Sequence, residues 1–177
     1  MLHWNNEWQA TELEFCNLIH DNNWGAATLV ETLEEQYKDR DVKLVSNKIE
    51  RMVSVKDQGD IKNYGSLMFE YLMVNTDTNE SRMGNTLSGQ THLYAVRFTE
   101  NATDTFFVMQ SKDLKDYLLY NRFESIPLQE WKRNKNRSEL KRTFNHTLCW
   151  RVYTKDLRKQ DWCVELNKID GKWVVKG

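Results

Sequence analysis

The sequence predicts a single α/β domain over residues 1–177, with a mixed β-sheet that contains a central acidic hairpin and is flanked by helices. A length of 177 residues suffices for one domain with a substantial core. Apolar residues recur at helical spacing early in the chain, whereas later segments alternate apolar and polar residues as strands do. One proline and seven glycines argue against long linkers between separate domains.

Two helices are predicted at the N-terminal end. Residues 4–22 carry a mostly apolar face, and residues 26–37 place apolar side chains at helical spacing. The polar side of the second segment carries Glu31, Glu34 and Glu35, which we interpret as an ordinary solvated acidic face.

A short strand is predicted at residues 41–45, and the acidic hairpin follows at residues 53–74. A turn-prone KNYG segment separates its two strands. Asp60 stands just before the turn, and Glu70 stands in the middle of the second strand. Both faces of that strand are mostly apolar, so we expect it to be central, and a carboxylate buried there must be paired with a base or bind a metal.

Two interpretations of Asp60 and Glu70 stay open. In the first, each carboxylate pairs with a lysine or arginine or lies at the edge of the sheet. In the second, the two carboxylates lie on adjacent strands, face a common pocket and bind one Mg²⁺ or Mn²⁺ ion, because hard cations prefer carboxylate oxygens.

Residues 75–89 are polar and predict a loop beside the hairpin, with Arg82 as their basic residue. Gln90 and Tyr94 share a face if the segment between them is helical. Arg82 and Gln90 are therefore candidate contacts to nucleic acid. The alternatives are a solvated arginine, and a surface glutamine next to a core tyrosine.

The rest of the chain predicts further strands and one helix. Residues 94–98 and 105–109 form a second hairpin, and Ser111 begins a helix. A strand follows at residues 149–153. Two last strands, at residues 162–166 and 172–175, are joined by an Asp-Gly turn.

Residues 129–142 have the strongest local excess of positive charge. Arg133, Lys135 and Arg137 lie there close to Trp131, a pattern that suits contact with a phosphate backbone. A solvated connector is the alternative. The formal net charge of the whole chain is -1, so a nucleic-acid-binding surface would have to be local.

The cysteines and histidines bear on the cellular location of the protein and on zinc binding. Three cysteines without a CxxC spacing predict reduced thiols and a cytoplasmic location. Four scattered histidines give little support for a zinc site. The N-terminus has no basic-then-apolar signal and no apolar run is as long as a membrane span, so we expect no membrane partner.

The acidic hairpin also resembles a known family. Gly59-Asp60-Ile61, a turn and an apolar strand with Glu70 are similar to the core of the PD-(D/E)XK nuclease-like superfamily, which has a restriction-endonuclease-like fold. The segments SRMGNTLSGQTHLYAVRF, SKDLKDYL and WRVYTKDLRKQDW are similar to small phage-type members of it. The resemblance extends loosely over residues 10–165. It implies metal-assisted hydrolysis of DNA phosphodiester bonds, with Asp60 and Glu70 as ligands of Mg²⁺ or Mn²⁺.

One position departs from the family pattern. The lysine that the family has two residues after the second acid falls on Leu72. The basic role then passes to Lys56, Lys62 or Arg82, and we predict Asp60, Glu70 and Lys62 as the catalytic set.

Leu72 also favours a different class of function. The alternative is a non-catalytic nuclease-like fold that binds nucleic acid or protein, such as a phage protein that engages a host factor.

Overall fold

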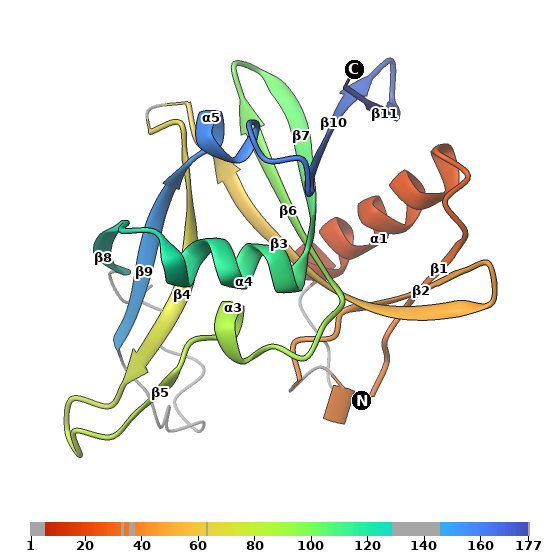
Figure 1. The fold of residues 1–177 in the computed structure, drawn as a ribbon. Helices are drawn as coiled ribbons and strands as arrows, with labels where there is room; N and C mark the ends of the chain where they lie inside the picture. The colour runs from red at the N-terminus through yellow and green to blue at the C-terminus, as the bar shows by residue number, and fades with distance from the viewer. Residues whose placement is uncertain (1–5, 33, 36–37, 63, 129–145, 177) are drawn as a thin grey trace.

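The computed structural model describes residues 6–32, 34–35, 38–62, 64–128 and 146–176, and shows one mixed α/β domain. A seven-stranded sheet lies in the middle. Helix α1 (Asn6–Asp21) packs on one face of it, and helix α4 (Ser111–Tyr120) and a four-stranded sheet pack on the other (Figure 1). In the described residues, no helix is long and apolar enough to cross a membrane.

The seven-stranded sheet is mixed. All of its neighbouring strands are antiparallel except β3 and β6, which run parallel. In spatial order the strands are β1 (Ala26–Leu29), β2 (Val42–Ser46), β3 (Ile49–Asp60), β6 (Leu93–Glu100), β7 (Thr103–Gln110), β10 (Cys163–Ile169) and β11 (Lys172–Val175).

The four-stranded sheet is antiparallel throughout. Its strands, in spatial order, are β5 (Ser81–Met83), β4 (Ser66–Val74), β9 (His146–Tyr153) and β8 (Glu124–Leu128). Two short helices, α3 (Asn85–Ser88) and α5 (Thr154–Leu157), follow β5 and β9. The connection from β3 to its parallel neighbour β6 therefore runs through β4, β5 and α3.

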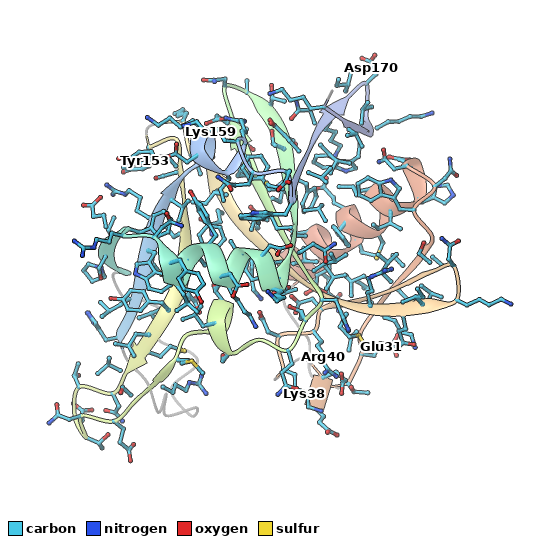
Figure 2. The ribbon with its side chains drawn as sticks, viewed as in Figure 1. Glu31, Lys38, Arg40, Tyr153, Lys159 and Asp170 are labelled. Carbon is cyan, nitrogen blue, oxygen red and sulfur yellow. The ribbon has the colours of Figure 1, made fainter. Side chains whose placement is uncertain are left out.

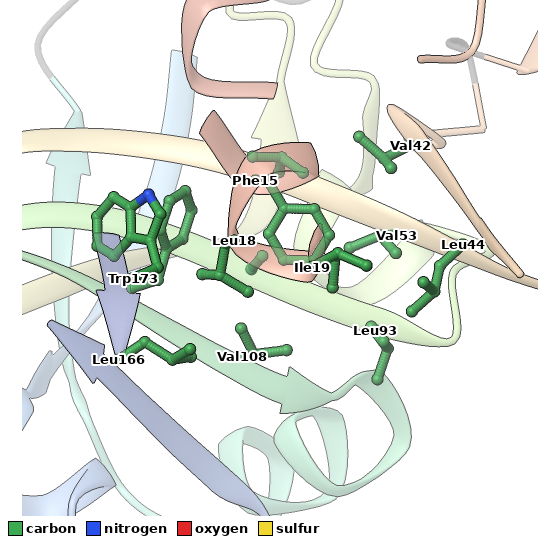
Figure 3. Packing of buried hydrophobic residues seen from close by; sticks show 13 residues of the cluster. Phe15, Leu18, Ile19, Val42, Leu44, Val53, Leu93, Val108, Leu166 and Trp173 are labelled. Atoms are coloured by element: carbon green, nitrogen blue, oxygen red, sulfur yellow. The ribbon is translucent and has the colours of Figure 1, made fainter. Parts of the chain in front are cut away.

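Two hydrophobic cores lie on opposite faces of the seven-stranded sheet, because side chains alternate along each strand. Phe106 of β7 packs with α1 on one face, and the next residue, Phe107, packs on the other. Figure 3 shows the first core, where Phe15 and Ile19 of α1 lie over Val53. The second core joins the sheet to β4, β9 and α4.

The predicted helix at residues 26–37 is wrong over residues 26–29, which form β1. Strand β1 pairs with β2 along its whole length, and Val30 N–H donates to the carbonyl of Asp41 just beyond it. Pairing with a neighbouring strand here outweighs a helical pattern in the sequence, since propensity is a weak local preference. Gly25, at φ +134°, makes the turn that leads from α1 into β1.

The predicted acidic hairpin is also wrong as a paired unit, because β3 and β4 belong to different sheets. Strand β3 makes its ladders with β2 and β6, whereas β4 makes its own with β5 and β9. The Gln58 side chain links the two strands: its Nε2 donates to the Met68 carbonyl at 2.6 Å, and its Oε1 accepts from the Met68 N–H at 2.8 Å.

Other predictions are confirmed within small shifts of boundary. They are the N-terminal helix, the β6–β7 hairpin, the helix from Ser111 and the β10–β11 hairpin. Asp170 and Gly171 both have positive φ angles, as a two-residue hairpin turn of this hand requires. The predicted loop at residues 75–89 contains β5 and α3.

Candidate functional site

Lys56 of β3 gathers carboxylates around its ammonium group. Its Nζ lies 2.5 Å from Oδ1 of Asp39 and 3.4 Å from Oδ2 of Asp41. The two aspartate side chains are only 12% and 13% exposed, so these charges are largely removed from water. Burial alone would lower the pKa of Lys56, but the charges of Asp41 and Asp39 outweigh it and raise that pKa. Lys56 therefore stays protonated.

Asp39 reaches Lys56 from a tight turn before β2. Its φ of 61° lies in the left-handed region, which aspartate tolerates better than most residues. Its neighbours Lys38 and Arg40 both pair with Glu35, and Figure 2 shows them together at the periphery of the molecule. The Asp39 carboxylate accepts hydrogen bonds from Ser54 Oγ, at 2.7 Å, and from Lys56.

Gly89 leaves the space that the Asp39 carboxylate occupies. A Cβ atom at this position would lie 3.2 Å from Oδ2 of Asp39 and 2.9 Å from the carbonyl oxygen of Asn85. The Asp41 carboxylate is held separately, because its Oδ2 accepts the backbone N–H of Val55 at 2.7 Å. Both aspartates are thus fixed against β3, Asp39 by Ser54 and Asp41 by Val55, and both contact Lys56.

Glu70 of β4 completes this group from the second sheet. Burial raises the pKa of its carboxyl, and the nearby positive charge of Lys56 opposes that rise. The backbone N–H of Asn85 donates to the carboxylate, but Oε2 is buried without a hydrogen-bond partner among the described residues. We call Asp39, Asp41, Lys56 and Glu70 the acid–lysine cluster.

Gly84 brings the Asn85 amide to Glu70. Its N–H donates to the carbonyl of Tyr71 at 2.9 Å, which lays the start of α3 directly on β4. A Cβ atom at Gly84 would lie 2.6–2.7 Å from backbone atoms of Glu70 and Tyr71. No larger residue fits without moving one of these two elements, because such distances are below van der Waals contact.

Tyr94 and Glu12 adjoin the cluster. Tyr94 is paired in register with Ser54, its hydroxyl lies 3.4 Å from Oγ1 of Thr86, and burial raises its pKa. Glu12 of α1 has its pKa raised to about 7, mainly by burial and next by the charge of Asp41. Glu12 can therefore gain and lose a proton near neutral pH, as a general acid or base must.

Asp60 lies apart from this cluster. It ends β3, is 50% exposed, and bonds to Lys62 through the Lys62 backbone N–H and, at 3.5 Å, through Nζ. Lys56, the neighbour of Glu70, is four residues earlier, which is about 13 Å along a strand. The expected convergence of Asp60 and Glu70 from paired strands is not formed, because their strands belong to different sheets.

The predicted basic and polar residues have separate positions. Lys62 is 64% exposed and lies by Asp60. Arg82 is exposed on β5, and its charge opposes, less than that of Lys56 does, the rise that burial gives to the pKa of Glu70. Gln90 is exposed, and its backbone bonds to Lys38 and Arg40. The predicted nucleic-acid contacts Arg133, Lys135 and Arg137 lie outside the described residues.

Of the three candidate bases, the charges of Lys56 and Arg82 act on Glu70 and that of Lys56 has the larger effect, whereas Glu12, Asp39 and Asp41 were missed. A weak signal existed for Lys56, since it follows the alternating residues Val53 and Val55 in β3. The aspartates gave none, because Lys38 and Arg40 beside them suggest a solvated turn. In the described part of the chain, no three or more His, Cys, Asp or Glu side chains are grouped so as to hold a metal ion.

Comparisons of the chain with protein-family models, with curated proteins and with solved structures found no match. The functional argument therefore depends on the chemistry of the chain's own residues.

Proposed function

We propose that this protein is a metal-dependent, nuclease-like hydrolase of DNA phosphodiester bonds, with its chemistry at the acid–lysine cluster. The observation that carries the proposal is Glu70, whose buried carboxyl feels the positive charge of Lys56 and has one oxygen without a hydrogen-bond partner among the described residues. An ionisable group placed in this way costs stability, and such groups gather at functional sites.

The position of Lys56 supports the resemblance to the nuclease-like superfamily, because Lys56 can replace the lysine that the sequence lacks at Leu72. The family pattern requires a lysine two residues after the second acid, where this chain has Leu72. The positive charge of Lys56, on β3 in the other sheet, acts on the Glu70 carboxyl and opposes the rise of its pKa. The acid and the lysine of the pattern are then divided between two strands.

The cluster also suits a divalent cation in its chemistry. Mg²⁺ in phosphate-processing sites is commonly held by one or two carboxylates together with waters and phosphate oxygens. Asp39 and Glu70 would hold such an ion here, because the charge of Asp39 acts on the Glu70 carboxyl, and the Glu70 oxygen that has no hydrogen-bond partner among the described residues is available to it. A bound Mg²⁺ or Mn²⁺ ion would activate water and offset the phosphate charge. Glu12 would accept a proton, and Lys56 would stabilise negative charge on the phosphate.

A second candidate function is a non-catalytic nuclease-like module that binds nucleic acid or protein, including a host factor. The double pairing of Lys56 favours it, because Asp39 and Asp41 already neutralise the ammonium charge. The cluster would then be structural. Removing one partner would strand a buried charge at a cost of about 3–5 kcal/mol.

The test compares Glu70→Gln with Glu31→Gln, which changes an exposed glutamate outside the acid–lysine cluster, as its matched control. Cleavage of single- and double-stranded DNA is measured with Mg²⁺ and with Mn²⁺, and melting temperatures are measured alongside. Glu70→Gln should lose cleavage by at least about 100-fold, as loss of a group that stabilises the transition state does, and should stay folded. Glu31→Gln should cleave as the wild type does.

Two results would refute this proposal. The first is a wild type that cleaves neither substrate with either metal. The second is full activity in Glu70→Gln together with loss of activity in Asp60→Asn, which would return the chemistry to Asp60.

A further inference from the structure

A pocket opens where the turn after β3 meets β4 and β9. Its volume is about 310 Å³. The lining residues are Gln58, Asp60, Ile61, Tyr64, Ser66, Met68 and Arg151. Neither the acid–lysine cluster nor Glu12 lines it, so the pocket is separate from that cluster.

The pocket continues the surface that carries the acid–lysine cluster. Gln58 lies two residues after Lys56 on β3, and Met68 lies two residues before Glu70 on β4. Residues two apart on a strand share a face, so each pair points the same way. The two hydrogen bonds between Gln58 and the Met68 backbone make a wall between pocket and cluster. Two residues along a strand span about 7 Å, which is the distance from the pocket residues Gln58 and Met68 to the cluster residues Lys56 and Glu70.

The pocket lining combines apolar, charged and aromatic side chains. Ile61, which is 4% exposed, and Met68 supply an apolar floor. Arg151, the register partner of Met68 on β9, supplies a cation, and Asp60 supplies a carboxylate that can accept N–H groups. The Tyr64 ring, 65% exposed, stands at the rim and can stack on a flat ring.

Arg151 is available to a ligand. Its Nη1 lies 3.0 Å from Oε2 of Glu124, and the Glu124 side chain is 61% exposed. Exposed ion pairs of this kind are weak, because water screens them, so a phosphate can compete for the guanidinium. Gln58, in contrast, uses both ends of its amide on Met68 and serves as a fixed wall.

We propose that this pocket binds one nucleotide of a DNA strand. Arg151 takes the phosphate, the base lies on Ile61 and Met68 against Tyr64, and Asp60 accepts an N–H of the base edge. A volume of about 310 Å³ is at the small end of ligand pockets, which suits a single nucleotide. The bound nucleotide would hold the next phosphate of the strand towards the acid–lysine cluster. That last step rests on the proposed function, whereas binding in the pocket does not.

The first experiment measures binding of the four deoxynucleoside 5′-monophosphates without metal, by titration calorimetry or amide chemical shifts. At least one should bind the wild type. Arg151→Gln should weaken that binding about tenfold or more, as loss of a charge-assisted contact does. Tyr64→Ala should weaken it by a similar factor through lost stacking. Arg122→Gln, an exposed arginine outside the pocket, should bind as the wild type does.

Further measurements separate this inference from the proposed function. Binding that depends on Arg151, in a protein that cleaves no DNA, would support the pocket and refute the nuclease. Cleavage with a KM unchanged in Arg151→Gln and Tyr64→Ala would refute the pocket and leave the nuclease standing. If Arg151→Gln fails to fold, Glu124→Gln replaces it, since freeing the guanidinium should tighten nucleotide binding. Unchanged binding in that variant, or no monophosphate binding to the wild type, would overturn the inference.

Discussion

Glu12 changes its charge state near neutral pH, and the cause is its position between α1 and Asp41. Burial and the aspartate charge together raise its pKa to about 7, against an ordinary value of 4.5. The folded protein thus binds this proton more tightly than the unfolded chain does. By linkage, the free energy of unfolding of the wild type falls as the pH rises from 4.5 to 7, because the unfolded chain has then lost the Glu12 proton while the folded protein still holds it.

The variant Glu12→Gln tests this link at the level of one residue. In metal-free buffer it should gain stability relative to the wild type above pH 7, because its side chain has no charge to bury. The gain should be about 1 kcal/mol after allowance for solvent screening of a partly exposed group. Urea unfolding at pH 5 and pH 8 measures it. A stability difference that is equal at both pH values would contradict the raised pKa.

The residues of the site were only partly predictable, for a physical reason. Glu70 interrupts an apolar strand, and a charge in such a place is visible in sequence, whereas Lys56 lies in a strand with several other charged residues. Asp39 sits among charged neighbours, and it is buried only because Gly89, fifty residues later, leaves room for its carboxylate. Burial that depends on a distant segment leaves no local pattern.

At the level of elements, the position of Glu70 depends on how α3 lies on β4. Gly84 permits this contact because it has no Cβ, and its own φ of −66° is an ordinary angle for any residue. The need for glycine is therefore steric. The Asn85 amide, which donates to Glu70, follows immediately in the chain.

Gly84→Ala should separate α3 from β4 and lower the free energy of unfolding by about 1–3 kcal/mol, as overpacking does. The Asn85 amide should then exchange its hydrogen with solvent faster, since Glu70 no longer accepts it. Gly59→Ala is the control. Alanine at position 59 is disfavoured by the backbone angle, a φ of +65°, and not by crowding, because nothing lies within 4 Å of the added Cβ. Equal exchange rates for Asn85 in the two variants would argue against this role of Gly84.

Elements set by local turns were predicted correctly, and those set by distant pairing were not. The β10–β11 hairpin follows from Asp170-Gly171, whose backbone angles any two-residue turn of that type needs. Strands β3 and β4 are also neighbours in sequence, yet β3 pairs with β6, more than thirty residues further on. The choice between a near and a far partner depends on which sheet edges are available, and sequence spacing does not state this.

At the level of the whole molecule, one sheet supports both hydrophobic cores. Phe106 and Phe107 are consecutive, fully buried, and on opposite faces of β7. Both cores pack on the same strands, so a loss of packing in one core weakens the sheet on which the other core also packs. This arrangement should make the protein unfold as a single cooperative unit.

The variants Phe106→Leu and Phe107→Leu test that cooperativity. Each should lower the free energy of unfolding by about 1–2 kcal/mol, since the side chain shrinks and loses aromatic contacts. Calorimetry should show one transition in both variants, shifted by similar amounts. Leu119→Ala, at a 60% exposed position, should leave the transition unchanged. Two resolved transitions in either variant would mean that the two cores unfold separately.

The order in which the chain enters the two sheets has a consequence for synthesis. The chain builds β1–β3 in the seven-stranded sheet, β4 and β5 in the other, and then β6 and β7 back in the first. It repeats the exchange with β8 and β9, and returns for β10 and β11. In a nascent chain, the four-stranded sheet is therefore incomplete until β9 emerges from the ribosome, and the seven-stranded sheet is incomplete until β11 emerges. No single cut can release either sheet as a whole fragment. Pairing across such separations is slow, so partly made chains would expose open strand edges to one another.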